Sequence, residues 1–508
     1  MMNKKKITSA LVSVYNKEKL APVIQKLVDF GIKIYSTGGT RNYIERMGVQ
    51  CTAVEDVTEY PSIFSGRVKT LHPRIFGGIL ARRDSAEDQK EASTYEVPFI
   101  DLVVVDLYPF EDTLERNPSE EEIIEQIDIG GIALIRAAAK NYRDVLVIPS
   151  KDYYDGLIHI LEENQGGTTL EERKHYALEA FNVSSHYDTV IFNHFNQDFN
   201  KQAFKQSYIA PTPLRYGENP HQRGIFFGRF DKLFDQLHGK QISYNNLIDI
   251  DAAVHLINDF PPRTFGILKH NNPCGLATRH DLTQAWKDAL AGDPVSAFGG
   301  ILISNGLIDE ETAGEINKLF FEVIIAPSYN ENALEILKSK KNRIILVQKS
   351  AFLPRRCYRS LLNGVIVQDK DLRTEYPTDL KTVTNKVAGD QELEDLLFAN
   401  KVVKHTKSNA IVLARDQQLL ASGMGQTSRI DALKQAIEKA RGFGFDLSGA
   451  VMASDAFFPF KDSVELARQY GIKTIIQPGG SKRDQESIDY CNEHQMTMVF
   501  TGVRHFRH

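Results

Sequence analysis

The strongest constraint on the fold is an alternation of short apolar runs with an amphipathic segment between residues 1 and 200. Residues 7–14, 32–35, 102–105 and 145–148 are rich in Val, Ile and Leu and predict strands, and residues 19–30 have the spacing of an amphipathic helix. Strands that alternate with helices are typical of a mostly parallel sheet covered by helices. Functional residues are expected at the carboxyl ends of such strands.

Chain length and a polar connection predict the domain organisation. A chain of 508 residues is long enough for about two to four domains. A helical stretch over residues 170–195 is followed by polar residues 196–202, which predict the end of a first domain. We expect that domain to span residues 1–200.

The residues after the first domain again have an α/β pattern, and short strings of sequence recur faintly within them. The pair Lys269-His270 recurs as Lys404-His405, and residues 296–298 resemble residues 455–457. This recurrence suggests that the second region consists of two related halves, which we expect to span residues 201–375 and 376–508.

Charge and cysteine content exclude several classes of protein. There are 61 Lys and Arg and 66 Asp and Glu, a net charge of −5, whereas a protein that binds a nucleic-acid backbone usually carries a positive excess. The 4 cysteines are too few for a disulfide framework and form no Cys-x-x-Cys pair of a zinc site. No run approaches the ~18 apolar residues of a membrane span, and the basic start lacks the apolar core of a signal peptide. We expect a soluble cytoplasmic protein that binds neither nucleic acid nor membrane.

Two segments of the first domain suggest an anion site. Residues 65–83 contain Arg and Lys but no carboxylate, and residues 36–40, Ser-Thr-Gly-Gly-Thr, follow a predicted strand and precede a helix. Glycines let backbone N–H groups approach an anion, and a helix N-terminus favours a phosphate. The alternative is a solvated basic loop beside an ordinary turn.

Four further residues of this domain carry groups that move protons or hold a carbonyl oxygen. Tyr108 follows a predicted strand, Asp128 precedes a Gly-Gly pair, and Lys69 and Lys140 supply cations. Taken singly, each is better explained by capping at the end of a strand.

The second region has three candidate clusters. Lys269-His270 sets a cation beside a titratable base at the end of a predicted strand. Residues 214–222 bring together a guanidinium, a phenol and an imidazole, and residues 454–462 form an aromatic cluster framed by acids. The aromatic cluster is either core packing or a slot for a flat heteroaromatic ring. Pro273-Cys274 is similar to part of the zinc-deaminase signature but lacks its second Cys and its His-x-Glu.

These strings together resemble one family over essentially the whole chain. The family joins aminoimidazole carboxamide ribonucleotide (AICAR) formyltransferase to inosine monophosphate (IMP) cyclohydrolase. The resemblance rests on residues 36–40, 66–73, 107–110, 127–131, 136–141, 214–222, 269–275, 296–299, 407–409, 425–429 and 454–462.

The resemblance implies a fold and two consecutive reactions. The fold is a methylglyoxal-synthase-like α/β domain with a parallel sheet, followed by two cytidine-deaminase-like α/β units. The later units transfer a formyl group from the co-substrate 10-formyltetrahydrofolate to AICAR, and the first domain closes formyl-AICAR to IMP. The resemblance also implies a homodimer with transformylase sites at its interface. It implies that no metal ion is required, and it is compatible with a structural potassium ion.

The resemblance implies roles for individual residues. In ring closure, the reacting groups are surrounded by Lys69, Tyr108, Asp128 and Lys140, and phosphate and ribose are bound by Ser13, Lys17, Thr37, Gly38, Gly39, Arg67, Lys69 and Thr70. In formyl transfer, His270 shuttles a proton, Lys269 stabilises an oxyanion, and substrates are bound by Arg215, Tyr216, His221, Asn246, Phe298, Glu322, Asn409, Arg429, Phe457, Asp462 and Arg504.

The sequence departs from the family pattern mainly in the first domain. Tyr15-Asn16 stands where Ser-Asp is common, Phe76 where His is common, and Asp106 where Asn is usual. A carboxylate at 106 is expected to raise the pKa of a neighbouring acid or to repel substrate. These departures keep open two alternatives: a transformylase whose first domain only binds a regulatory nucleotide, and a non-catalytic nucleotide-binding protein.

Overall fold

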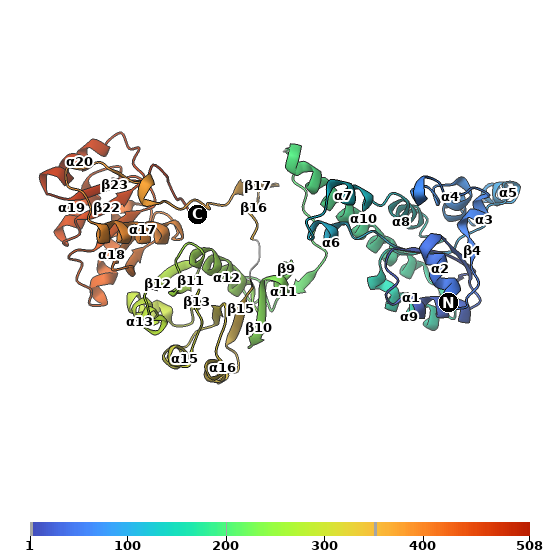
Figure 1. Ribbon diagram of the computed structural model, residues 1–508, viewed down its shortest axis with the longest axis horizontal. Helices are drawn as coiled ribbons and strands as arrows, with labels where there is room; N and C mark the ends of the chain where they lie inside the picture. Colours follow the sequence, from blue (N-terminus) through green and yellow to red (C-terminus); the bar gives the residue numbers. More distant parts are fainter. Residues whose placement is uncertain (1–3, 200, 350–352) are drawn as a thin grey trace. The chain divides into compact units, whose positions relative to one another are not determined.

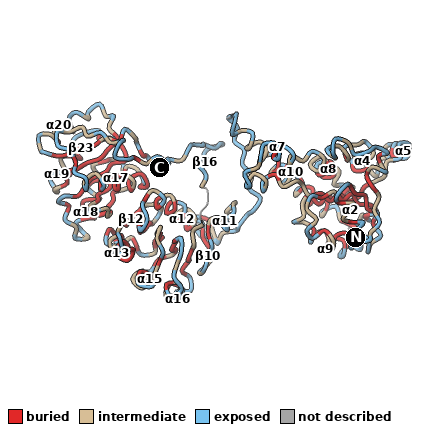
Figure 2. The backbone as a smooth tube through the Cα atoms, viewed as in Figure 1, coloured by how far each residue is buried: buried red, intermediate tan, exposed pale blue. Residues whose placement is uncertain are grey.

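The computed structural model describes residues 4–199, 201–349 and 353–508 (Figure 1). The chain divides into two compact units, with the boundary between Ile209 and Ala210. In each unit the buried residues are concentrated in the strands and on the helix faces that cover them (Figure 2). No described helix is long and apolar enough to cross a membrane.

The described part of the first unit contains a five-stranded sheet in the order β4-β3-β2-β5-β6. Its strands are β2 (Ser9–Val14), β3 (Lys33–Ser36), β4 (Thr52–Ala53), β5 (Leu102–Asp106) and β6 (Leu146–Ile148), and all neighbours are parallel. The predicted parallel sheet is therefore confirmed. A separate antiparallel pair joins β1 (Lys5–Lys6) to β7 (Gly167–Thr168).

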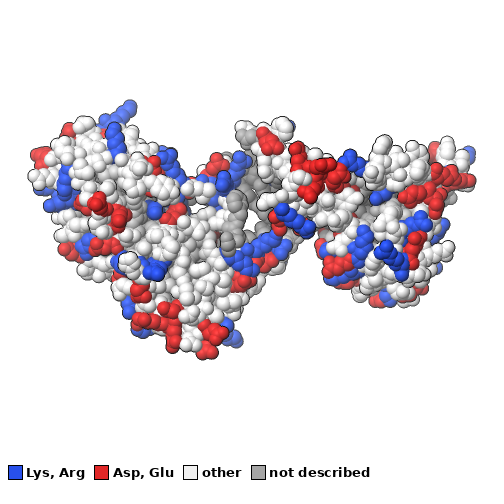
Figure 3. All heavy atoms as spheres, in the orientation of Figure 1, with Lys and Arg blue, Asp and Glu red and all other residues white. Residues whose placement is uncertain are grey.

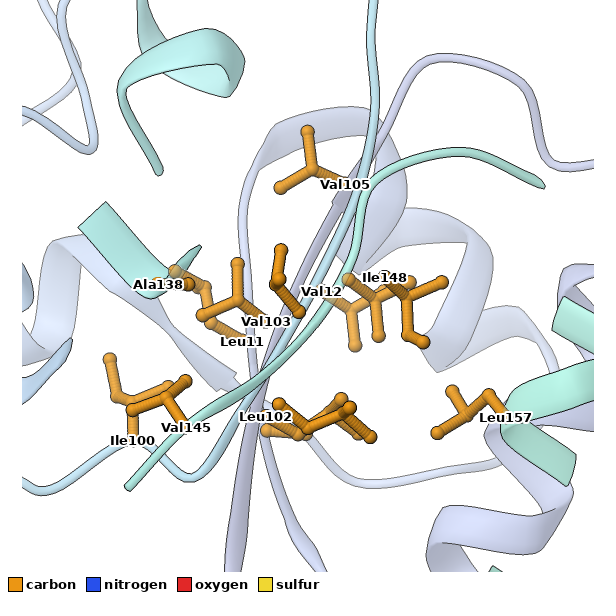
Figure 4. Close-up of a cluster of buried hydrophobic side chains, with 14 of the residues drawn as sticks. Leu11, Val12, Ile100, Leu102, Val103, Val105, Ala138, Val145, Ile148 and Leu157 are labelled. Atoms are coloured by element: carbon orange, nitrogen blue, oxygen red, sulfur yellow. The ribbon is translucent and has the colours of Figure 1, made fainter. Parts of the chain in front are cut away.

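The helices of this unit are α1 (Leu20–Asp29), α2 (Gly38–Arg46), α3 (Val54–Thr58), α4 (Pro73–Leu80), α5 (Ala86–Thr94), α6 (Phe110–Leu114), α7 (Glu120–Glu125), α8 (Gly130–Lys140), α9 (Tyr154–Glu163) and α10 (Leu170–Phe199). Helices α1, α2, α8 and α10 pack on the sheet, and α6 and α7 form a smaller apolar cluster with α10. Figure 4 shows Leu11 and Val103 of the central strands near Ala138 of α8, while Leu157 of α9 lies on the opposite side of the strands. Full burial of each such Leu or Val contributes roughly 1.5–3 kcal/mol.

The second unit is built on one long mixed sheet. Among its described residues the strand order is β10-β15-β14-β13-β11-β12-β20-β19-β21-β22-β23-β18. The elements of its first part are β8 (Pro211–Pro213), β9 (Ile225–Phe227), α11 (Phe230–Leu233), β10 (Phe234–His238), α12 (Tyr244–Ile257), β11 (Thr264–Lys269), β12 (Asn272–Thr278), α13 (Leu282–Gly292), α14 (Pro294–Ala297), β13 (Ile301–Ser304), α15 (Glu310–Ile316), β14 (Val323–Ala326), α16 (Glu331–Lys338) and β15 (Ile344–Gln348).

The later part of this unit begins with an exposed hairpin. Its elements are β16 (Arg356–Leu361), β17 (Gly364–Asp369), β18 (Lys381–Thr382), α17 (Asp390–Lys404), β19 (Ile411–Arg415), β20 (Gln418–Gly423), α18 (Arg429–Gly442), β21 (Val451–Ser454), α19 (Asp462–Gln469), β22 (Thr474–Gln477), α20 (Asp484–Glu493) and β23 (Thr497–Phe500).

The same order of elements occurs twice in the sheet. In each copy a helix leads into an antiparallel hairpin, the first hairpin strand also pairs antiparallel with a third strand, and two parallel strands follow. The copies join where β12 meets β20, at Ala277 and Gln418. This repeat supports two related halves, and their boundary at residues 375 and 376 stays a prediction.

The sequence pairs that suggested the repeat are not structurally equivalent. Lys269 ends strand β11, whereas Lys404 ends helix α17. Residues 296–298 precede strand β13, whereas residues 455–457 follow strand β21. The similarity of the short sequence strings is therefore coincidental. The repeat is seen in the pairing of the strands.

Candidate active sites

A cavity of about 670 Å³ opens at the carboxyl ends of β2, β3 and β5 in the first unit. Ser13 and Thr37 line it from the ends of β2 and β3, and Tyr108 lines it beyond β5. The loops 65–70 and 124–131 complete its wall. The sheet thus brings together residues that are far apart in the sequence, as expected for a parallel α/β sheet.

One side of the cavity is suited to an anion. Helices α2 and α8 both begin there, and neither has an acidic residue in its first turn or a side-chain cap at its N-terminus. Helix dipoles and N-terminal N–H groups favour a phosphate here, and at α8 the N–H of Gly131 is already bound by the carboxylate of Asp128. Lys17 adds a cation, whose Nζ donates to the carbonyl oxygens of Val14 at 3.0 Å and Tyr15 at 2.7 Å. Burial lowers the pKa of Lys17, and nearby Asp106 partly opposes that effect.

Two glycines keep the cavity wall close-packed at the start of α8. A Cβ at Gly130 would lie 3.0 Å from Thr70 Oγ1, and a Cβ at Gly131 would lie 2.7 Å from Asp128 Oδ2. Larger residues would displace Thr70 and Asp128. The Gly-Gly pair therefore allows two proposed site residues to approach the start of α8.

Asp128 and Tyr108 form the acid–base part of the cavity. Asp128 Oδ1 accepts the backbone N–H of Gly131 at 2.6 Å, and the N–H of Asp128 donates to Tyr187 Oη at 2.9 Å. Burial raises the pKa of Asp128, while backbone N–H groups and Lys69 oppose that shift. Burial and then the Asp128 charge raise the pKa of Tyr108. A carboxylate with a raised pKa beside a lysine can accept or return a proton.

The cavity does not gather every residue predicted for it. Lys69, Arg67 and Gly39 line it, and Arg67 forms an ion pair with Glu125 of α7. Gly38 begins α2 with a φ of 42°, a conformation that favours glycine. Lys140 is exposed at the C-terminal end of α8, at the opposite end of that helix from Gly131.

The three departures from the family pattern have defined surroundings. Both carboxylate oxygens of Asp106 are engaged, one by the N–H of Asn16 at 3.1 Å and one by the N–H of Lys151 at 3.2 Å. Phe76 packs against the core of the unit, and Tyr15 lies edge-on to Tyr108 with ring centroids 5.2 Å apart. Asp106 therefore joins β5 to neighbouring loops, and burial raises its pKa.

In the second unit, Lys269 ends strand β11 and His270 begins the tight turn to β12. His270 and Asn271 both have left-handed φ values, 52° and 65°. The Nζ of Lys269 donates to the carbonyl oxygen of Phe298 at 2.6 Å, and Asp249 Oδ1 accepts the N–H of Asn271 at 2.7 Å. These contacts fix the Lys269 ammonium and the backbone of the turn that carries His270.

A second cluster surrounds Arg429 at the start of α18. Its guanidinium forms a buried ion pair with Asp455 and donates to Asn409 Oδ1 at 2.9 Å. The backbone N–H of Lys407 donates to Asn272 Oδ1 at 2.8 Å, which ties this cluster to the Lys269–His270 turn. Residues from the two related halves thus meet at one region of the sheet.

The remaining predicted residues have more local contacts. Glu322 pairs with Lys240, Arg215 donates to Tyr216 Oη at 2.7 Å, and Phe298 contacts Phe320 with centroids 5.1 Å apart. Ser243 caps α12 by accepting the backbone N–H of Asn246 at 3.2 Å, and Asn246 Oδ1 accepts the Ser243 hydroxyl at 2.9 Å.

Three more of the predicted residues lie at or near the surface of the second unit. His221 lies in an exposed loop, Asp462 begins α19, and Phe457 is 38% exposed. The exposed ring of Phe457 is consistent with a slot for a flat ring, whereas its neighbour Phe458 is fully buried and serves the core.

The sequence predicted no individual role for two acids of the second site. Asp455 carries the charge that pairs with Arg429, and Asp249 fixes the turn that holds His270. The available signal for Asp455 was its place directly after the strand end at Ser454, where parallel strands present functional side chains. Asp249 lies within a helix and gave no such signal.

Cys274, which follows the Lys269–His270 turn, is a buried thiol. Burial raises the pKa of this thiol to about 12.

Comparisons with known proteins match the whole chain. The AICARFT/IMPCHase bienzyme family matches residues 138–439, and the MGS-like domain family matches residues 19–133. The "Bifunctional purine biosynthesis protein PurH" of Bacteroides thetaiotaomicron is 62% identical over 508 residues, covering 100% of both chains. The proteins of the same name from Persephonella marina and Aquifex aeolicus are 44% and 45% identical, covering 98% of this chain and 99% and 100% of their own.

Proposed function

The chain belongs to the AICARFT/IMPCHase bienzyme family, and we propose how its two units divide the two reactions of that family. It is a bifunctional enzyme of purine biosynthesis with AICAR transformylase and IMP cyclohydrolase activities. The bifunctional relatives favour this reading over a first domain that only binds a regulatory nucleotide. We assign ring closure to the first unit and formyl transfer to the second.

The cavity of the first unit is the observation that supports the assignment of ring closure. The N-terminal ends of α2 and α8 with Lys17 and Arg67 would bind the ribotide phosphate. Lys69, Tyr108 and Asp128 would then surround the formamide and carboxamide groups. The substrate-binding set would also include Ser13, Thr37, Gly38, Gly39 and Thr70.

Ring closure joins the carboxamide nitrogen to the formyl carbon and expels water. The nitrogen loses a proton as it attacks, and the formyl oxygen must gain protons to leave as water. Asp128, with its raised pKa, is suited to the proton transfer, and Lys69 and Tyr108 to stabilising the oxygen. The exposed position of Lys140 leaves its catalytic role a prediction.

Formyl transfer would occur at the cluster of the second unit. The amine of AICAR attacks the formyl carbon of the folate, the bond from that carbon to the folate nitrogen breaks, and a proton passes from the amine to the departing nitrogen. We assign the proton transfer to His270 and stabilisation of the intermediate oxyanion to Lys269. Substrates would be held by Arg215, Tyr216, His221, Asn246, Phe298, Glu322, Asn409, Arg429, Phe457, Asp462 and Arg504.

The transformylase activity implies a folate co-substrate, which we propose to be 10-formyltetrahydrofolate. We also propose a homodimer in the cytoplasm, with formyl transfer at the subunit interface and no required metal ion. On the face drawn in Figure 3, acidic and basic residues are interspersed over both units, with no extended basic surface of the kind that binds nucleic acid.

An absorbance assay on the full chain tests the proposed division. AICAR and 10-formyltetrahydrofolate are supplied together, and the formation of tetrahydrofolate and of IMP is followed. Both products are expected. Tetrahydrofolate without IMP would contradict ring closure in this chain, and the absence of both products would contradict the assignment as a whole.

A further inference from the structure

The last eight residues form an irregular segment in which Thr501 and His505 are buried. Residues 501–508, all within the described part of the chain, follow β23 without helix or strand, yet His505 is only 2% exposed. An irregular terminal segment stays ordered only when specific contacts hold it. His505 supplies the most deeply buried of these contacts.

Both nitrogens of the His505 ring face carboxylates from one segment. Nδ1 lies 2.6 Å from Asp371 Oδ2, and Nε2 lies 3.2 Å from Glu375 Oε2. Asn400 of α17 donates to the same Glu375 oxygen at 2.8 Å and so fixes that carboxylate. A neutral imidazole donates only one hydrogen bond, so two acceptors require the imidazolium.

The main chain around His505 is fixed to the substrate cluster. Its N–H donates to the carbonyl oxygen of Asp455 at 3.0 Å, and the side chain of Asp455 pairs with Arg429. Two residues on, the N–H of Arg507 donates to Ser408 Oγ at 3.0 Å, beside Asn409. The segment is therefore attached on both sides of Phe506.

The ring of Phe506 in turn contacts the guanidinium groups of two arginines. The Arg504 guanidinium lies 4.3 Å from the centroid of the Phe506 ring, and the Arg429 guanidinium lies 5.9 Å from the same centroid. Two arginines thus flank one ring that His505 and Arg507 hold in place. Such contacts restrict the orientation of both cations.

We propose that His505 is a positioning residue for formyl transfer: it binds Asp371 and Glu375 and so holds the C-terminal segment where Arg504 stands beside Arg429 in the AICAR site. The proposal rests on the proposed function, because it assumes that Arg504 binds the phosphate of AICAR. His505 itself need not touch the substrate. Its contribution is the fixed position of the segment.

The test is steady-state kinetics of the full-length His505→Gln variant. Glutamine can donate to one carboxylate but carries no charge, so the segment should loosen. We expect the KM for AICAR to rise about tenfold, which corresponds to about 1.4 kcal/mol. The KM for 10-formyltetrahydrofolate and the rate of ring closure from formyl-AICAR should stay within about twofold of wild type.

Two further variants separate positioning from general damage. His280→Gln changes an exposed histidine of the same unit and should leave all constants unchanged. His505→Lys restores a cation between the carboxylates and should recover part of the AICAR affinity. An unchanged KM for AICAR in His505→Gln, an equal rise in His280→Gln, or no recovery with lysine would each overturn the proposal.

A milder variant covers the case in which His505→Gln does not fold. Asp371→Asn removes one charge from a carboxylate that is 42% exposed, while keeping a hydrogen-bond acceptor. It should raise the KM for AICAR about threefold, and an unchanged KM would overturn the proposal. Formyl transfer by the wild-type chain tests the proposed function separately, since its absence would be seen before any variant is compared.

Discussion

Asp128 accepts the backbone N–H of Gly131 at 2.6 Å, so the proposed proton-transfer group also holds the first turn of α8. This relationship explains why a carboxylate is placed beside a Gly-Gly pair. A side chain at Gly131 would come within 2.7 Å of the Asp128 oxygen. The fold and the chemistry at this point therefore depend on the same two residues.

Asp128→Asn should separate these two roles. The amide oxygen can still accept the Gly131 N–H, so the first unit should stay folded, but asparagine cannot accept a proton. We expect the rate of conversion of formyl-AICAR to IMP to fall about 100-fold, measured by absorbance. Formyl transfer should be unchanged, and the exposed Asp112→Asn should serve as a silent control. Ring closure at the wild-type rate would remove Asp128 from the mechanism.

Lys69→Ala removes the cation that lines the cavity near Asp128. We expect ring closure to slow by about 100-fold because the developing charge on oxygen loses its partner. The matched variant Lys90→Ala, at an exposed position of α5, should have no effect on either reaction. If Lys69→Ala slows formyl transfer as much as ring closure, the division of labour between the units is wrong.

His270→Ala should have the opposite pattern. The turn at residues 270 and 271 is fixed by backbone contacts to Asp249, so the site should keep its shape without the imidazole. Formyl transfer should fall at least about 100-fold, followed as tetrahydrofolate release, while ring closure continues. His280→Ala is the control, and normal transfer in His270→Ala would disprove the proton-shuttle role.

Arg429→Met should destabilise the second unit. The variant leaves the carboxylate of Asp455 buried without its cation, which costs about 3–5 kcal/mol. Trp286, the single tryptophan of the chain, is buried in α13 of this unit, so its fluorescence during urea unfolding reports the unit selectively. Adding Asp455→Asn should recover part of the loss, because the uncompensated charge is then absent. A single variant as stable as wild type would mean that the pair contributes little.

The stability of the second unit should fall at alkaline pH through His505. Burial by itself lowers the pKa of His505, but the hydrogen bonds to Asp371 and Glu375 outweigh burial and raise the pKa from 6.5 to about 9. The folded pKa exceeds the unfolded one, so the stabilisation is complete below pH 6.5 and is lost as the pH rises through about 9. The free energy of unfolding should fall by roughly 3 kcal/mol over this interval.

Tryptophan-monitored unfolding of wild type and His505→Gln between pH 6 and pH 10 measures this dependence. The variant should lack the alkaline decrease. Asp371 and Glu375 face the ring directly, and Lys404 lies near Asp371, so Lys404→Met should change the slope less than His505→Gln does. Parallel curves for wild type and His505→Gln would refute the assignment of the decrease to His505.

The sequence alone determined the local elements and the class of the first unit. The apolar runs at residues 102–105 and 145–148 form strands β5 and β6, and the amphipathic segment at residues 19–30 contains helix α1. These signals are local, because strand and helix patterns depend on neighbouring residues. The family was also recognisable, since its motifs are contiguous strings.

Only the tertiary structure decided which distant residues meet. In the folded chain Arg429 pairs with Asp455, and two carboxylates contact His505. A backbone N–H group donates to Asp106, and Lys140 is exposed at the far end of α8. The tertiary structure also showed that the repeat lies in strand pairing and not in the two echoed strings. The physical reason is that ion pairs, burial and strand register join residues of large sequence separation, for which a single sequence carries no local signal.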